Sequence, residues 1–275
     1  MKTSRSSMVI ILLFLFSSLI PVFAQKDMQQ YNTMLLVDGS SHVNARWGGK
    51  PKINVFRQAL GDTLAVLNKS PAWGFNTGIR VFGDRSERDV NDCLDARLGN
   101  KIDWFEPVVI NSVAEGIRPK GRNCLAFAIS TVKDDYPKGV KNAQNYLVCV
   151  ISSRDECSKD EKETLEWISK ESQLTATYII GMNLSQKDSE YLTEIFKSVP
   201  GEFINVTDPE KLAPTMITVL NQYCRGIKPS DSIPESAAEG DSKPPESTKP
   251  DTAESGSSKT AASGKPDPKP DASGK

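Results

Sequence analysis

An aspartate, two serines and a histidine stand directly after a short apolar run near the start of the chain. The run Met34–Val37 has four consecutive apolar residues, which is typical of a strand covered on both faces in a parallel sheet. Asp38, Ser40 and His42 then fall past the carboxyl end of that strand, where open α/β sheets hold their ligands. Carboxylate and hydroxyl oxygens are preferred by Mg2+ and Ca2+, so Asp38 and Ser40 are candidate ligands of a hard cation. The alternative is an acid and serines that cap a turn or the next helix.

The same three residue types also occur in hydrolase triads. His42 is the single histidine of the chain and is a near neighbour of Ser40, and such neighbours in a tight turn do not readily form an in-line nucleophile–base pair. One histidine also excludes a multi-histidine zinc site. The sequence contains no dinucleotide fingerprint, phosphate-binding loop or nucleophile elbow. We therefore predict that the protein is not an enzyme, with a hydrolase that uses Asp38, Ser40 and His42 as the alternative.

Between residues 30 and 225, the spacing of the apolar residues is typical of strands and of helices in turn. These strands and helices must position the side chains named above. Strand patterns cover residues 34–38, 77–82, 93–98, 146–151, 174–181 and 203–206. Helix patterns cover residues 53–67, 106–116, 125–132, 159–171, 185–198 and 208–223. This alternation predicts an α/β fold with a doubly wound, mostly parallel central sheet and helices on both faces.

The two ends of the chain differ from this middle part, 30–225, which we predict to be one domain. Residues 1–24 combine basic residues, an apolar run and small residues up to Ala24, the pattern of a cleaved secretory signal peptide. An uncleaved anchor is the alternative, although the run is short for a bilayer span. Residues 226–275 are rich in Pro, Ser, Lys, Asp and Glu, and we predict a disordered tail. No later stretch is long and apolar, so the expected location is secreted or periplasmic, with no transmembrane segment after signal removal.

Export makes the five cysteines candidates for disulfide bonds. Cys93 and Cys157 lie in polar loop sequence and are the predicted bridge. Cys149 lies inside an apolar run, and Cys124 and Cys224 fall in helical patterns, so these three are predicted to be packed thiols.

Four phrases of the sequence resemble one known family. They are Leu36–Ser40, Phe75–Gly83, Ile117–Leu125 and Val148–Cys157. In this order and spacing, the chain from Thr33 to about Ile217 resembles a von Willebrand factor type A domain. It is particularly similar to secreted bacterial members with cysteines in two of the loops at one end. The resemblance implies a metal-ion-dependent adhesion site at the carboxyl end of the sheet.

The family draws its metal ligands from an Asp-x-Ser-x-Ser loop, a later Thr and an Asp after the fourth strand. By this resemblance Asp38 and Ser40 match, His42 replaces the second Ser, Asn123 replaces the Thr, and Ser152 (or Ser153) replaces the Asp. Losing an acid and gaining an imidazole weakens a site for a hard cation, although Asn123 can offer a carbonyl oxygen. Asp38, Ser40 and Asn123 are thus the predicted ligands of weakly bound Mg2+ or another divalent cation, and no other cofactor is predicted. The competing interpretation is a degenerate site that binds its partner without metal.

A second candidate surface follows the Asp38 loop. Arg46 and Trp47 stand beside two glycines, and Trp and Arg are frequent at interface hot spots. With His42 and Ser152 they form the predicted ligand loops, and the alternative is that Trp47 folds back on the domain. The balance of 34 basic and 35 acidic residues argues against a nucleic-acid partner. The resemblance implies an exported protein-binding or adhesion module, with an envelope scaffold attached through its tail as the alternative.

Overall fold

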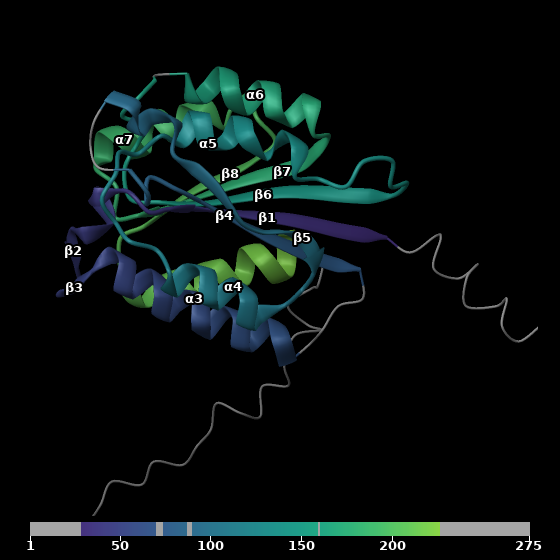
Figure 1. Cartoon of the computed structure of the whole chain (residues 1–275), viewed down its shortest axis with the longest axis horizontal. Coiled ribbons are helices and arrows are strands. Elements are labelled where there is room, and N and C mark those ends of the chain that lie inside the picture. The colour runs from purple at the N-terminus through teal and green to yellow at the C-terminus, as the bar shows by residue number, and fades with distance from the viewer. Residues whose placement is uncertain (1–28, 70–73, 87–89, 159, 226–275) are drawn as a thin grey trace, which may run out of the picture. The chain divides into compact units, whose positions relative to one another are not determined.

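The computed structural model in Figure 1 describes residues 29–69, 74–86, 90–158 and 160–225. The predicted signal peptide (1–24) and tail (226–275), and with them the scaffold alternative, lie outside the described residues. A central sheet has the strand order β5-β4-β1-β6-β7-β8. Its strands are β1 (Gln30–Asp38), β4 (Phe75–Phe82), β5 (Ala96–Trp104), β6 (Ala143–Ile151), β7 (Leu174–Met182) and β8 (Gly201–Val206). All neighbours pair in parallel except β5, which runs antiparallel to β4.

Helices cover both faces of this sheet (Figure 1). One layer contains α3 (Lys52–Lys69) and α4 (Pro107–Glu115), with α8 (Leu212–Ile217) packed against α3. The other contains α5 (Leu125–Thr131), α6 (Glu161–Glu171) and α7 (Gln186–Ile195). The predicted doubly wound α/β class is therefore confirmed. No helix within the described ranges combines the length and the apolar character that a membrane span requires.

The side chains of β1 show why its sequence is an unbroken apolar run. Leu35 and Val37 belong to the core on the α3 side, whereas Met34 and Leu36 belong to the core on the α5 side. All four are essentially fully buried. A central parallel strand buries both of its faces, so it needs apolar residues at every position.

The structure differs from the sequence prediction in two regions before β5. The strand predicted at 93–98 is present as β5 but is displaced, because Val90–Leu94 forms a 3-10 helix and β5 begins at Ala96 and continues to Trp104. Along β5 only Ile102 is buried, as expected for an edge strand, so its sequence gives a weak strand signal. A short hairpin of β2 (Arg46–Trp47) and β3 (Lys50–Pro51) was not predicted, and its two linking glycines both have positive φ, 58° and 81°.

The order of the strands creates a crevice at one end of the sheet. After β1 the chain forms β4 on one side of it and later forms β6 on the other side. Where the winding direction reverses in this way, the loops beyond the carboxyl ends of the strands separate and leave a crevice. Asp38 ends β1 and Ser152 follows β6, so both lie at this topological switch point.

Candidate functional site

Backbone contacts draw three loops together at the carboxyl end of the sheet. The Ser41 N–H donates to Gly121 O at 2.8 Å, and the Gly121 N–H donates to Gly83 O at 2.9 Å. Gly83 has φ +71°, and a side chain there would lie 2.4 Å from Arg122 O. Only glycine fits this approach, so the Gly83 turn sets how closely the loops meet.

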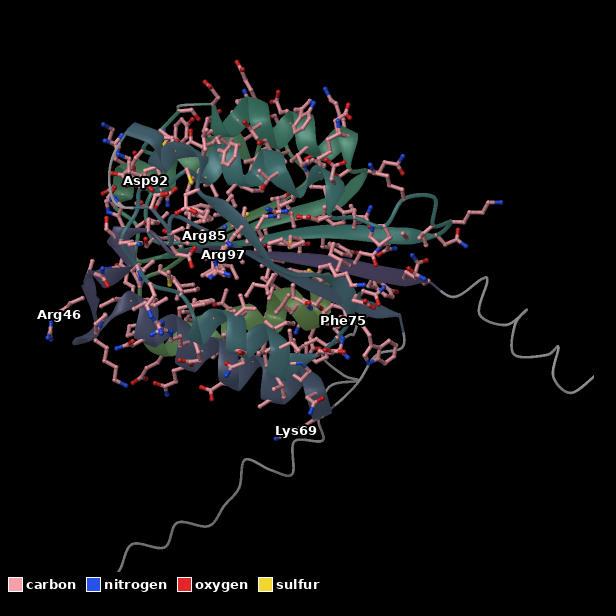
Figure 2. All side chains as sticks on the ribbon, in the orientation of Figure 1. Arg46, Lys69, Phe75, Arg85, Asp92 and Arg97 are labelled. Atoms are coloured by element: carbon pink, nitrogen blue, oxygen red, sulfur yellow. A yellow bond between two sulfur atoms is a disulfide. The ribbon has the colours of Figure 1, made fainter. Side chains whose placement is uncertain are left out.

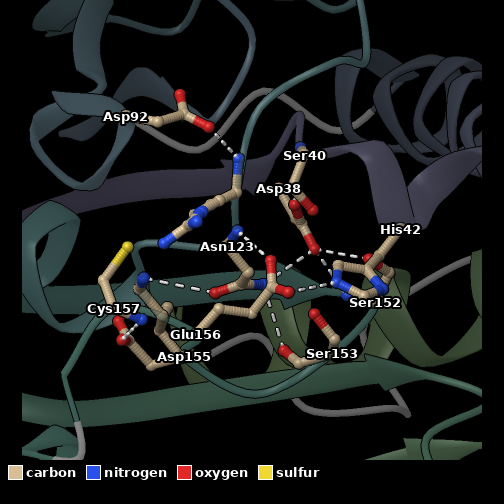
Figure 3. A network of polar contacts seen from close by, with 12 residues as sticks. Asp38, Ser40, His42, Asp92, Asn123, Ser152, Ser153, Asp155, Glu156 and Cys157 are labelled. Atoms are coloured by element: carbon tan, nitrogen blue, oxygen red, sulfur yellow. Dashed lines mark hydrogen bonds and ion pairs between the residues drawn. The ribbon is translucent and has the colours of Figure 1, made fainter. Parts of the chain in front are cut away.

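Asp38 is fully buried and lies at the centre of a hydrogen-bond network (Figure 3). Its Oδ1 accepts from the backbone N–H of Ser40 at 2.8 Å. Its Oδ2 accepts from Asn123 Nδ2 at 3.0 Å, and from the N–H and hydroxyl of Ser152 at 2.9 and 2.5 Å. A carboxylate has about four acceptor positions. The structure thus brings together Asp38, Asn123 and Ser152. Donors from Ser40, Asn123 and Ser152 satisfy the carboxylate of Asp38.

The amide of Asn123 faces Asp38 with its nitrogen. Besides its bond to Asp38, Nδ2 donates to Ser153 O at 3.1 Å, while Oδ1 accepts from the N–H of Leu125 at 3.2 Å. Exchanging the two amide atoms would place an oxygen against two acceptors, so the surrounding bonds fix this orientation. A position expected to offer a carbonyl oxygen to a cation therefore presents a donor instead.

His42 turns toward a different acid. Its Nε2 lies 3.1 Å from Glu156 Oε1, an ion-pair distance. Glu156 Oε2 accepts from the N–H of Asn123 at 3.0 Å, and the Glu156 N–H donates to Asn123 O at 2.8 Å. Glu156 thus links the His42 turn to the Asn123 loop, as Figure 3 shows. Glu156 was not predicted from the sequence.

Lys52, the first residue of α3, brings a positive charge to the same crevice and was also missed from the sequence. Its side chain is buried, and Nζ donates to Ser152 O at 3.2 Å and to Asn183 O at 3.4 Å. Burial lowers the pKa of the Lys52 ammonium, and the charge of Asp38 acts in the opposite direction. One buried ammonium and one buried carboxylate therefore offset each other within this network.

The side chains at the crevice do not fit a divalent cation well. In favour of one, Ser40 Oγ is buried and has no hydrogen-bond partner among the described residues. Against it, the Asp38 oxygens are already bonded, Asn123 presents N–H groups, and the Ser152 hydroxyl donates to Asp38. Within the described ranges, no cluster of three or more His, Cys, Asp or Glu residues is placed to hold a metal. A hard cation needs several oxygen ligands in place of its water shell, and this set supplies few of them.

The crevice also does not assemble the residues of the hydrolase alternative into a triad. Asp38 bonds to the backbone of Ser40 rather than to His42, and His42 approaches Glu156. A nucleophile must be within hydrogen-bond reach of its base, and Ser40 Oγ has no such partner in the described part of the chain.

The two hairpin residues predicted to contact a partner are placed differently. Trp47 is buried, and its indole N–H donates to Thr207 O at 2.8 Å, so its ring packs back on the domain. Arg46, the first residue of β2, is exposed, and its Nη1 donates to Gly49 O at 2.8 Å (Figure 2). Only Arg46 is therefore available on the surface, and Trp47 anchors the hairpin.

A disulfide and an acid fix the loop after β6. The structure joins Cys93 and Cys157, the predicted pair, across a Cα–Cα distance of 5.5 Å. Asp155 accepts hydrogen bonds from the N–H groups of Ala126, Cys157 and Ser158 at 2.6–2.7 Å. Burial raises the pKa of Asp155 in spite of these donors. The other three cysteines are buried free thiols, and burial raises the pKa of Cys124 to about 12.

Comparison with known proteins gives relatives at low identity. No family model matches the chain. The uncharacterized protein YwmD of Bacillus subtilis (strain 168) is 21% identical over 195 residues, which covers 70% of this chain and 85% of YwmD. The pilus adhesin SpaC of Lactobacillus rhamnosus GG is 10% identical with a TM-score of 0.56, covering 69% of this chain and 30% of SpaC. A von Willebrand factor type A structure from Catenulispora acidiphila is 13% identical with a TM-score of 0.52, covering 70% of this chain and 42% of the other.

These comparisons define the class of fold. The chain has the fold of a von Willebrand factor type A domain, as its resemblance to the family implied. It spans less than half the length of either solved structure. At such identities the similarity establishes the fold alone, because proteins with one fold can have unrelated functions.

Proposed function

We propose that the protein is an exported module that binds a protein partner through the loops at the carboxyl end of its sheet, without a metal ion. One observation carries this proposal, the satisfaction of Asp38 by Ser40, Asn123 and Ser152. Because donors of the protein satisfy the Asp38 carboxylate, no cation is needed to neutralise it. The same hydrogen bonds hold the surrounding loops in one arrangement. SpaC, a pilus adhesin, has the same fold, which supports a binding role over a catalytic one.

The predicted ligand-loop residues divide into two roles under this proposal. Ser152 and Trp47 are buried and hold the loops in place. His42 is partly exposed and Arg46 is exposed, so these two are the proposed contacts with the partner. Export is supported by the Cys93–Cys157 disulfide, because such bonds persist in oxidising compartments.

A pull-down from the native cell envelope with the purified full chain tests the function. A specific protein should be captured, and Arg46→Glu should weaken its binding by about tenfold, because a reversed charge at the rim of an interface opposes association. Lys138→Glu is the matched control, since Lys138 is exposed before β6 at the other end of the sheet. The proposal fails if no protein is captured, or if both variants reduce capture equally.

Metal independence gives a separate prediction. Millimolar Mn2+, Mg2+ or EDTA should leave the melting temperature of the wild type unchanged, measured by calorimetry. Restoring the family pattern with His42→Ser, Asn123→Thr and Ser152→Asp, together with Lys52→Met, should create cation-dependent stability. At a hundred times the dissociation constant, the bound ion would add about 2.7 kcal/mol. Stabilisation of the wild type by Mn2+ would show that the present residues do form a metal site.

A further inference from the structure

A second polar feature, a hollow lined by arginines, lies beside the Asp38 loop. It is a shallow, open depression of about 510 Å3 between the turn after β4, the start of β5 and the last turn of α4. Arg85, Arg97 and Arg118 contribute to its lining, with Asp84 as the one acid. Figure 2 shows Arg85 and Arg97 next to each other, away from Arg46. A side chain on Gly39 would come within 2.7 Å of Asp84 Cβ, so the hollow adjoins the site described above.

Arg97 is held in a fixed orientation in this hollow. Its Nε lies 3.0 Å from both oxygens of Asp84, and its Nη2 donates to Asp84 Oδ2 at 2.6 Å. Both groups are largely buried, and a fork of this kind determines the plane of the guanidinium. Nη1 makes no hydrogen bond with any described residue, so its two N–H groups remain for a ligand.

The other two arginines are exposed but are attached to fixed backbone. The N–H groups of Arg85 and Ser86 both donate to Asp95 Oδ2, at 2.7 and 3.1 Å. Arg118 Nη1 donates to Glu115 O and Ile117 O at 3.0 and 3.1 Å. Within the described ranges, the Arg85 guanidinium and the Nε and Nη2 of Arg118 have no hydrogen-bond partner.

Most of the described acids around this hollow are buried, but Glu115, on the last turn of α4, is exposed. Four of these acids are no more than 6% exposed: Asp38, Asp84, Asp92 and Asp95. Arg85 and Arg118 are exposed, and the lining has three arginines against one buried acid, Asp84, so its formal charge is +2 although the whole chain carries a net charge of −1. Positive surface charge steers the approach of an acidic partner.

We propose that this hollow binds a carboxylate side chain of the partner protein, an inference that rests on the proposed function. A guanidinium matches a carboxylate in two parallel hydrogen bonds. A phosphate would share much of this chemistry. Phosphate sites, however, commonly use successive backbone N–H groups, and here the N–H groups of Arg85 and Ser86 are already bonded to Asp95.

Nuclear magnetic resonance of the 15N-labelled full chain tests the hollow directly. The arginine Nε–H signals of Arg85, Arg97 and Arg118 should shift in a saturable way when a capped tri-glutamate peptide is added. Inorganic phosphate should bind more weakly, and capped tri-glutamine should cause no shift. Arg85→Gln/Arg118→Gln should weaken tri-glutamate binding roughly fivefold, as expected for two exposed ion pairs. Arg46→Gln is the control, because it also removes the charge of an exposed arginine, but at the hairpin. This variant should bind tri-glutamate as tightly as the wild type does.

The possible outcomes separate this inference from the proposed function. Absent shifts, equal shifts at Arg46, or tighter binding of phosphate than of tri-glutamate would each overturn the carboxylate assignment. If Arg85→Gln/Arg118→Gln captures the envelope partner as well as the wild type does, the hollow is not its binding site and the proposed function stands. If tri-glutamate binds the hollow but the wild type captures no protein, the proposed function fails instead.

Discussion

Replacing both bridge cysteines, as Cys93→Ser/Cys157→Ser, is expected to lower the free energy of unfolding by about 4 kcal/mol. The bridge joins residues separated by 64 positions, so it removes many conformations from the unfolded chain. It also ties the 3-10 helix at Val90–Leu94 to the loop after β6. Urea unfolding of the oxidised wild type and of the double variant, at the same pH and ionic strength, measures the difference.

Reduction of the wild type provides the control for this experiment. With excess thiol the wild type should lose the same stability, and the double variant should lose none. Peptide mapping of the oxidised protein without reduction should find Cys93 linked to Cys157 and the other three cysteines free. Two free thiols at Cys93 and Cys157, or equal stability with and without reductant, would contradict the prediction.

The central elements of the fold could be predicted from the sequence because their patterns have a direct physical cause. β1 and β6 are buried on both faces, so the sequence of each contains a continuous apolar run. α3 buries one stripe, with Phe56, Leu60 and Leu64 spaced four residues apart. The alternation of these two patterns is enough to specify a doubly wound sheet.

Edge elements and short turns could not be placed as well. β5 buries little of its surface, and its pairing with β4 contains register shifts, so it has no clear alternation. The β2–β3 hairpin pairs only two residues on each side, too few for a period to appear.

At the site, the sequence predicted which loops meet but not how their atoms are used. Asp38, Asn123 and Ser152 do converge. No sequence pattern specifies that Asn123 presents its nitrogen, because this depends on Ser153 and Leu125, which it contacts in the fold. Lys52 did leave a signal, since it stands four residues before Phe56 on the buried stripe of α3. A lysine in an apolar stripe indicates a charge that the fold must neutralise.

Asp38→Ala is expected to lower the free energy of unfolding by about 4 kcal/mol, because it leaves the buried Lys52 ammonium without its compensating charge. It also leaves four donors, from Ser40, Asn123 and Ser152, without their acceptor. Urea unfolding measures the loss. Asp103→Ala serves as the control and should change stability little, since Asp103 is an exposed partner of Lys101 and solvent screens such pairs.

The double variant Asp38→Ala/Lys52→Met separates the effect of the charge from that of the hydrogen bonds. If the two buried charges offset each other, removing Lys52 as well should recover about 1–3 kcal/mol of the stability that Asp38→Ala loses. Lys52→Met alone should cost less than Asp38→Ala, since the Asp38 hydrogen bonds remain in place. Strictly additive effects of the two substitutions would show that Asp38 and Lys52 do not interact. In that case the two charges would not offset each other, and only the hydrogen bonds to Asp38 would make the site independent of a metal ion.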